Sequence, residues 1–379
     1  MTEREKYWLW LCSAETIGQA SMDKLLKSFG DIEAVFKCDR RTLDKFEWLD
    51  EKQKEDLCKY KSRAGLDELS KTLSEKGISF ISCENKAYPK KLKHIFEYPR
   101  GLFYMGTPPW DFDGNLKAAS KLTLAVVGAR QCTLWGSEQA RQFAEKLSEY
   151  GVHIISGMAS GIDAAAHWGA LKAKKATTAV LGSGPDVCYP VRNGELYARI
   201  KKDGCIISEY PPSCAPLAWH FPRRNRILSG LADGVLVVEA RERSGSLITA
   251  GLALEQGKDI FAVPGRGCDA LSSGCNNLIR QGAFLAGKPE DILDYYRIPY
   301  EEIKKNKIRL AKTENMVYST MCLTPKYIEE ICAKTALPVS DIISALYRLE
   351  KEGLIVRLGT QQYMVKQPGA KVVESAEGI

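Results

Sequence analysis

The sequence has few histidines and no closely spaced cysteines. Only 4 histidines occur in the 379 residues, and none of the 12 cysteines stands in a Cys-x-x-Cys pair. Zinc sites are commonly built from such pairs, and disulfide frameworks are typical of short secreted chains. We therefore expect neither a metal site nor a disulfide framework, and we interpret most cysteines as small buried hydrophobic residues.

Long hydrophobic runs are also missing. No stretch reaches the ~18 apolar residues that a membrane span needs. The first residues, "MTEREKYWLWLC", lack the apolar core of a cleavable signal peptide. These absences predict a cytoplasmic protein with no membrane partner. The formal net charge of +7 permits an anionic partner but does not require one.

The usual nucleotide and hydrolase motifs are absent or incomplete. The turn "GARQCTLWG" is not Gly-x-Gly-x-x-Gly, the second strand ends without an acidic residue, and no Walker A sequence occurs. "GMASG" formally matches the nucleophile elbow of serine hydrolases, but no later Asp and His pair suits a triad. We therefore expect no bound cofactor and no serine-hydrolase chemistry.

Residues 1–65 are predicted to form a small helical module of the SAM-like kind. Apolar residues recur there at three-and-four spacing, as in "SMDKLLKSFG". A helix-hairpin-helix relative that grips DNA is an alternative, but "ETIGQAS" lacks the paired glycines which that role needs. Packing or protein contact is therefore favoured for this module.

Residues 66–299 are predicted to form the core. From residue 121 onward, near-continuous apolar strands alternate with helices, from "KLTLAVVGA" to "DIFAVPG". This alternation is typical of an α/β fold with a parallel sheet covered on both faces. The helix before "GVLVVEA" is expected to begin at "NRILSGLAD", after the segment "HFPRR".

The last part of the chain is predicted to be a separate module. Residues 300–315 look like a charged linker, and residues 316–366 show the helix, turn, helix and two short strands of a winged helix. The tail after residue 366 is expected to be frayed. The helix "SDIISALYRLEK" could bind duplex DNA or a protein; its charges of both signs favour protein contact or packing.

The predicted strand ends carry small residues and arginines. Ligands bind outside the carboxyl ends of parallel strands, where backbone N–H groups and helix N-termini attract phosphates. The strand-end segments are Gly128-Ala129-Arg130, Ser156 to Gly161, Gly182-Ser183-Gly184, Ser208-Glu209-Tyr210, and Arg241 to Ser246. A rim of this kind suits a single strand of nucleic acid, whose bases stack on aromatic rings, and the candidate rings here are Tyr189, Tyr210, Trp219 and Phe221.

Several side chains near this rim have two interpretations. Arg130 should project to the ligand, and Phe221 is expected to be exposed. At least one of Arg223, Arg224 and Arg226 is expected to pair internally with Glu209, Glu239 or Asp163, because a lone buried carboxylate is costly. Tyr189 is favoured as a turn residue packed on the core, and Asp163 and His167 as a capping acid and a hydrogen-bonded histidine.

These motifs resemble the DNA-processing protein A family (DprA, also called Smf). The matching segments cover roughly residues 85–290 and are "VVGAR", "SGMASGIDAAAH", "AVLGSGPDVCYP", "SEYPP", "HFPRRNRILSGL", "VLVVEARERSGSLITAGLALEQGKDIFAVPG" and "SSGCNNLIRQGA". The resemblance implies an extended Rossmann-like core that binds single-stranded DNA. It also implies a homodimer that loads the RecA recombinase during natural transformation, without enzymatic activity.

The resemblance implies that Arg130 grips a DNA phosphate and that Phe221 lines a base pocket. Many members carry a lysine three residues ahead of that phenylalanine, whereas this chain has Ala218, so the cationic contact is missing or moved to Arg223 or Arg243. The full set of predicted DNA-binding residues is Gly128, Ala129, Arg130, Gly157, Ser160, His220, Phe221, Arg223, Arg224, Asn225, Arg243, Ser244 and Gly245.

Two other functions remain open on the sequence. One is a nucleotide-processing enzyme of the phosphoribohydrolase-like fold, with "SGSLITAGLALE" as phosphate loop and Glu255 as catalytic carboxylate. Such enzymes tend to show Gly-Gly-x-Gly-Thr, and this chain reads Ser-Gly-Ser-Leu-Ile-Thr. The other is a scaffold whose rim binds nothing, which the arginine-lined glycine turns disfavour.

Overall fold

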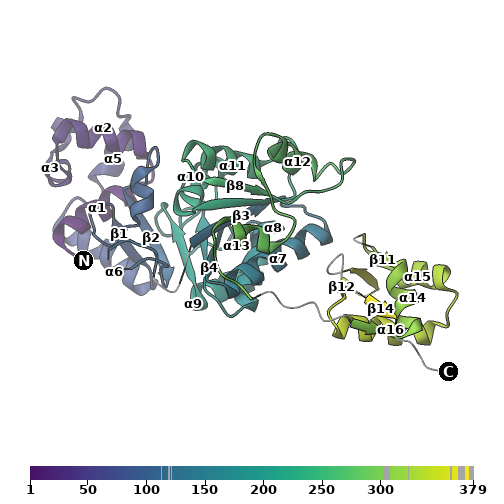
Figure 1. Ribbon diagram of the computed structural model, residues 1–379. Helices are drawn as coiled ribbons and strands as arrows, with labels where there is room; N and C mark the ends of the chain where they lie inside the picture. Colours follow the sequence, from purple (N-terminus) through teal and green to yellow (C-terminus); the bar gives the residue numbers. More distant parts are fainter. Residues whose placement is uncertain are drawn as a thin grey trace. The chain divides into compact units, whose positions relative to one another are not determined.

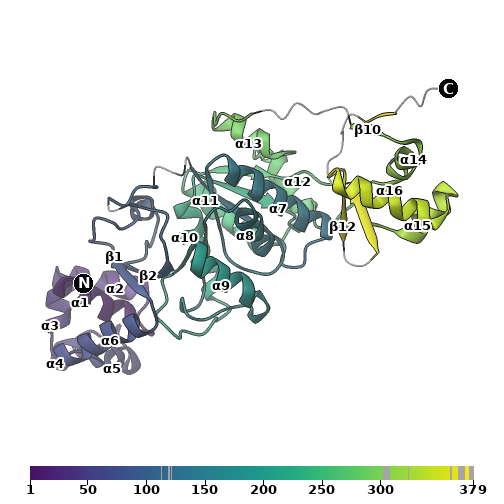
Figure 2. The ribbon, with the colours of Figure 1, turned by 90° about the horizontal axis from the view of Figure 1, so that it is seen from below.

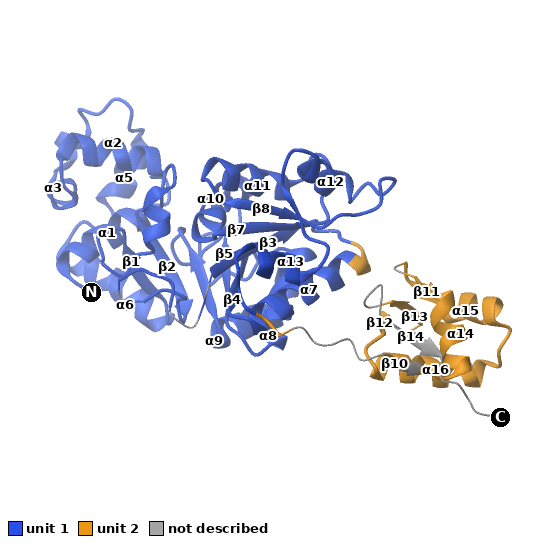
Figure 3. Ribbon diagram, in the orientation of Figure 1, with its two compact units in different colours: residues 1–132, 136–299 blue, residues 133–135, 300–379 orange. Residues whose placement is uncertain are grey.

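The chain is divided into two compact units (Figure 3). Unit 1 comprises residues 1–132 and 136–299, and unit 2 comprises residues 133–135 and 300–379. The computed structural model describes residues 1–111, 113–117, 120, 122–301, 308–322, 324–358, 361–365 and 372–374. None of the helices in these ranges is long and apolar enough to span a bilayer.

Unit 1 is built on a large, mostly parallel sheet. Within the described residues it has nine strands in the order β1-β2-β6-β5-β4-β3-β7-β8-β9. The strands are β1 (Ser79–Ser82), β2 (Gly101–Gly106), β3 (Leu122–Gly128), β4 (Val152–Ser156), β5 (Thr177–Leu181), β6 (Cys205–Ser208), β7 (Gly234–Val238), β8 (Asp259–Ala262) and β9 (Phe284–Leu285). The strands from β6 to β9 are parallel, as predicted, whereas β1 and β2 add an antiparallel edge.

Helices cover both faces of this sheet (Figures 1 and 2). The helices of the sheet region are α7 (Leu134–Glu149), α8 (Ile162–Lys172), α9 (Gly194–Asp203), α10 (His220–Leu231), α11 (Gly245–Glu255), α12 (Ser273–Arg280) and α13 (Pro289–Tyr295). Figure 1 shows α10 and α11 on one face and α7 and α8 on the other. Strands β3, β4, β5 and β7 are accordingly buried along nearly their whole length, which explains their continuous apolar sequences.

The N-terminal residues are helical, as the spacing of their apolar residues predicts. Their helices are α1 (Glu3–Ser13), α2 (Gln19–Phe29), α3 (Ile32–Lys37), α4 (Arg40–Leu43), α5 (Glu51–Cys58) and α6 (Arg63–Glu75). Thr2 and Glu5 form a capping box at the start of α1. Trp8, Leu9 and Leu11 of α1 join the same hydrophobic core as Phe103 of β2 and Ile206 of β6.

The order in which the chain adds strands to the sheet reverses at β3. The chain runs outward through β4, β5 and β6, then returns through α10 to place β7 on the other side of β3. Gly128 at the end of β3 allows the two strands to lie close, because a Cβ there would stand 1.9 Å from the carbonyl oxygen of Val238. A crevice between two such strand ends is the usual ligand site of an open α/β sheet.

Among its described residues from 308 onward, unit 2 has three helices, a three-stranded antiparallel sheet and one parallel pair of strands. Its elements are β10 (Ile308–Leu310), α14 (Lys312–Thr320), β11 (Lys326–Tyr327), α15 (Ile328–Thr335), α16 (Val339–Lys351), β12 (Ile355–Leu358), β13 (Gln362–Val365) and β14 (Val372–Glu374). Strand β10 and the first residues of helix α14 fall in the second half of the predicted linker, so that half has regular secondary structure. The linker residues 302–307, and the predicted frayed tail apart from β14, lie outside the described residues.

Candidate functional site

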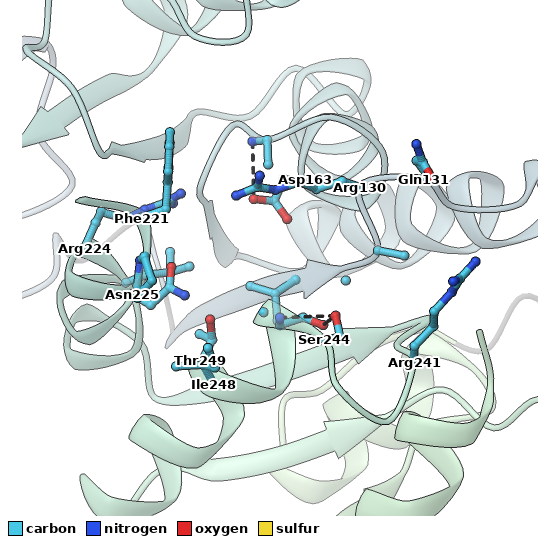
Figure 4. A pocket seen from close by; sticks show the side chains of 18 of the residues that line it. Arg130, Gln131, Asp163, Phe221, Arg224, Asn225, Arg241, Ser244, Ile248 and Thr249 are labelled. Carbon is cyan, nitrogen blue, oxygen red and sulfur yellow. Dashed lines mark hydrogen bonds between the residues drawn. The ribbon is translucent and has the colours of Figure 1, made fainter. Parts of the chain in front are cut away.

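A cleft of about 750 Å³ opens at the crevice between β3 and β7. It is lined by Val127, Gly128, Ala129, Arg130, Gln131, Ala159, Asp163, Tyr189, Pro216, Ala218, Phe221, Pro222, Arg224, Asn225, Leu228, Arg241, Arg243, Ser244, Gly245, Ser246, Ile248, Thr249 and Leu271. Figure 4 shows Phe221, Arg224 and Asn225 on one side of the cleft, with Arg130 facing them. Four arginines and one carboxylate are among the lining residues, so the cleft favours an anion.

Helix α10 supplies one wall of the cleft. It begins at His220, five residues earlier than the sequence predicted, and its first turn accepts Pro222 because a proline lacks only an N–H that would be unpaired there. Phe221, Arg224, Asn225 and Leu228 all line the cleft. Their spacing of three and four residues places them on one face of the helix. The segment "HFPRRN" is therefore helix rather than loop.

Arg224 forms part of the floor of the cleft. Only 3% of Arg224 is exposed, and burial lowers the pKa of its guanidinium to about 10, so it stays charged at neutral pH. Within the described residues, its Nε and Nη1 atoms have no hydrogen-bond partner. A buried cationic donor that is left unpaired is costly, and negative charge in the cleft that Arg224 lines would lower this cost.

Two neighbours hold Arg224 in place. Gly157 lies directly against it, since a Cβ at this glycine would stand 1.8 Å from Nη1 of Arg224. The buried carboxylate of Asp163 accepts hydrogen bonds from the backbone N–H groups of Gly157 (3.1 Å) and Ala159 (3.3 Å). Burial raises the pKa of Asp163, and the nearby charge of Arg224 opposes this rise. Asp163 thus ties the loop after β4 to the first turn of α8. The N-cap of α8 is Gly161, without a side-chain hydrogen bond, so Asp163 does not cap this helix as predicted.

An aromatic pair stands beside Arg130. The guanidinium carbon of Arg130 lies 5.2 Å from the ring centroid of Phe221, and the rings of Phe221 and Tyr189 are 5.4 Å apart. Arg130 is exposed and lines the cleft. Phe221 is half-buried rather than exposed, because these two side chains cover its ring. The packed-turn interpretation of Tyr189 is wrong, since this residue is 43% exposed and lines the cleft.

The other two arginines of α10 point elsewhere. Arg226 forms an ion pair with Glu209, and both side chains are less than a tenth exposed. This confirms the prediction that one arginine of the segment pairs internally. Arg223 extends toward the N-terminal helices, where its Nη1 atom would lie 3.4 Å from a Cβ at Gly18. Three arginines within four helical residues therefore face three directions.

The loop after β7 provides the opposite wall. Arg241 and Arg243 are exposed, and both line the cleft. Ser244 caps α11, with its Oγ atom accepting a hydrogen bond from the N–H of Ser246 (3.4 Å). The first turn of α11, with its partial positive charge, thus borders the cleft as well.

Nine of the thirteen predicted residues line the cleft, and four do not. His220 is buried, and its Nδ1 atom lies 3.0 Å from the carbonyl oxygen of Gly182. Ser160 is buried and accepts a hydrogen bond from Nε of Arg192 (2.8 Å). Gly157 lies behind Arg224, and Arg223 faces Gly18. These four therefore support the cleft or neighbouring elements rather than line it.

Some lining residues were missed by the sequence analysis. Ile248 and Thr249 could have been found from the helix that follows Ser244, since its first two turns border the rim. Gln131 directly follows the predicted Arg130. Leu271 comes from a loop after β8, and no sequence pattern connects it to this rim.

Comparisons with known proteins agree on one family. The model of the family described as DNA recombination-mediator protein A matches residues 79–297. The chain is 37% identical to Protein Smf of Escherichia coli over 295 residues, which is 75% of this chain and 76% of the relative. It is 45% identical to the DNA processing protein DprA of Streptococcus pneumoniae over 213 residues, or 56% of this chain and 72% of the relative.

Two solved structures share the fold. The DNA processing protein A structure from Streptococcus pneumoniae has a TM-score of 0.57 at 34% identity, covering 79% of this chain and 99% of that one. The Helicobacter pylori DNA processing protein A, whose structure concerns its single-stranded DNA binding mode, has a TM-score of 0.51 at 26% identity, covering 59% and 97%. With the match to the family model, these likenesses show that the chain belongs to the DNA recombination-mediator protein A family.

Proposed function

We propose that this protein binds single-stranded DNA in the cleft between β3 and β7. The observation that carries the proposal is the buried guanidinium of Arg224, whose Nε and Nη1 atoms have no hydrogen-bond partner among the described residues, beneath a rim with Arg130, Arg241 and Arg243. Phosphates suit these cations, and a base can stack on the exposed side of the Phe221 and Tyr189 pair. The Helicobacter pylori relative, which is described as binding single-stranded DNA, supports the same ligand.

We propose binding rather than catalysis as the role of this cleft. The alternative enzyme would use Glu255 as its catalytic carboxylate. Glu255 is exposed and is the last residue of α11, whereas the cleft is lined by residues at the start of that helix. Six residues of helix, or about 9 Å, separate Glu255 from Thr249, which is the last residue of α11 that lines the cleft, and Glu255 does not line the cleft itself. This carboxylate is therefore badly placed for a ligand in the cleft.

The proposed binding is tested with a fluorescent single strand of about 30 nucleotides. We expect tight binding that weakens as salt rises, because every phosphate contact releases counterions, with a slope of about −0.7 in the logarithm of affinity for each contact. A duplex of the same sequence should bind more weakly, since its bases cannot reach the aromatic pair. Salt-independent binding, or equal affinity for the duplex, would contradict the proposal.

We further propose that the bound strand is passed to RecA in the cytoplasm, as in natural transformation and homologous recombination. The family description as a recombination mediator supports this role. The measurement is the lag before RecA hydrolyses ATP on a strand already coated with single-strand-binding protein. The protein should shorten that lag, and an unchanged lag would argue against RecA loading.

We also propose that the protein is a homodimer. Strand β9 is the last strand of the sheet order, and its Phe284 and Leu285 are exposed. An edge strand with exposed apolar side chains is prone to pair with another chain, and a second copy of this protein would cover it. Light scattering of the free protein measures its mass directly, and a monomer at micromolar concentration would count against the dimer.

The roles of the end modules are extensions of the same proposal. We propose that α1 to α5 form a SAM-like module and that unit 2 is a winged helix. The order of α14, β11, α15, α16, β12 and β13 and the antiparallel pairing of β13 with β11 and β12 support the winged helix. The exposed face of α16 carries Ile343 and Tyr347 rather than a row of cations, which favours a protein partner over duplex DNA.

A further inference from the structure

An exposed tryptophan stands just outside the cleft. Ala218, Phe221 and Pro222 line one edge of the cleft, and Trp219 lies between them in the chain but is not among the lining residues. Trp219 is 56% exposed. It is the residue before the first turn of α10. The wall that carries Phe221 therefore continues past the cleft as a large aromatic surface.

The indole of Trp219 has a rigid support. Its ring meets the ring of His220 edge-on, with centroids 4.0 Å apart and an interplanar angle of 75°. His220 in turn stacks on Tyr210 at 3.8 Å and contacts the carbonyl oxygen of Gly182 through Nδ1. Burial lowers the pKa of His220, so this ring is neutral at neutral pH. The buried stack limits the orientations of Trp219, and a ligand that uses the indole finds it already ordered.

Among the described residues, 217–222 carry no cation beside Trp219, and the guanidinium over Phe221 comes from Arg130, after β3. Ala218 occupies the edge itself, Leu217 is exposed next to it, and Arg223 on the following turn faces Gly18. A strand that passes this edge would meet apolar and aromatic surface rather than charge. Nucleobases stack on such surfaces with little dependence on sequence.

We propose that Trp219 is a second base-stacking platform, which binds a base of the strand where it leaves the cleft past Ala218. This rests on the proposed function of the cleft. The platform is separate from the Phe221 and Tyr189 pair and adds affinity without neutralising a phosphate. Its contribution is therefore insensitive to salt, unlike that of the arginines.

The platform is tested with Trp219→Ala and Trp219→Phe in the full-length chain. We expect Trp219→Ala to bind an oligothymidine of about 30 nucleotides about tenfold more weakly, which is a typical loss for one stacked base. Trp219→Phe should recover most of the affinity because it keeps a ring. The salt slope should be the same in Trp219→Ala as in wild type. A strand of equal length without bases should bind wild type and Trp219→Ala equally.

Three controls separate this inference from the proposed function. Phe96→Ala removes another exposed aromatic ring of unit 1 that does not line the cleft, and it should leave affinity unchanged. Binding should quench tryptophan fluorescence less in Trp219→Phe than in wild type. If the Trp219 variants keep wild-type affinity and quenching while Arg130→Glu loses binding, the stacking platform is wrong but the cleft remains the DNA site. Wild-type binding by Arg130→Glu would overturn the cleft as the DNA site.

Discussion

The Arg130→Glu variant is expected to bind a single strand of about 30 nucleotides roughly 100-fold more weakly than wild type at ~0.1 M salt. Arg130 is exposed at the end of the turn after β3, and its guanidinium lies over Phe221. A charge-assisted hydrogen bond contributes about 1.5–3 kcal/mol, and about 1.4 kcal/mol is a tenfold change in affinity. Glutamate removes that bond and repels the phosphate as well.

The salt dependence of the same variant tests the mechanism. Loss of one phosphate contact should reduce the slope of log affinity against log salt by about 0.7. The matched control is Arg199→Glu, which makes the same charge change on α9, outside the cleft, where Arg199 forms an ion pair with Asp203 (3.1 Å). Arg199→Glu should bind nearly as wild type does. Equal weakening by both variants would mean that net charge, not the cleft, governs binding.

The sequence predicted the rim but not the directions of its side chains. The positions of β3, β4, β5 and β7 followed from apolar runs of strand length, and the carboxyl ends of parallel strands necessarily meet at one edge. Glycines and arginines at those ends were therefore sufficient to place Gly128, Arg130, Arg243 and Gly245 together. This part of the site depends on local sequence and on a general rule of sheet topology.

The part of the site that comes from α10 depends on the residue at which this helix begins. The sequence predicted that α10 begins at Asn225. The residues "HFPRR" before it were therefore not assigned to a helix, and helical spacing could not be used to predict which of them face the cleft. A start at His220 puts Phe221 and Arg224 on the cleft, turns Arg226 toward Glu209 and buries His220. The partners that decide these directions, Gly157, Glu209 and Gly18, come from distant parts of the chain. Contacts of that kind cannot be read from the spacing of residues along one segment.

The Arg226→Met variant is expected to lose about 3–5 kcal/mol of the free energy of unfolding of unit 1, because a buried charge would be left without its partner. Glu209 is 5% exposed at its side chain and pairs with Arg226, which is 8% exposed. A loss of that size is a large share of the stability of an ordinary domain. Urea unfolding followed by tryptophan fluorescence measures it, since every tryptophan precedes residue 220 and the fluorescence therefore does not arise from residues 300–379.

The double variant Arg226→Met with Glu209→Met separates the value of the pair from the penalty of breaking it. Removing both charges leaves no unpaired carboxylate, and two methionines fill similar volumes, so stability should return to within about 1 kcal/mol of wild type. Neither residue lines the cleft, so the double variant should also retain its affinity for single-stranded DNA. If the double variant were instead as unstable as Arg226→Met, the attraction between Arg226 and Glu209 would itself stabilise the contact between α10 and the end of β6. Avoiding a lone buried charge would then not be the main effect. If it were stable but bound DNA poorly, the pair would be needed to orient α10 and the arginine it presents to the cleft.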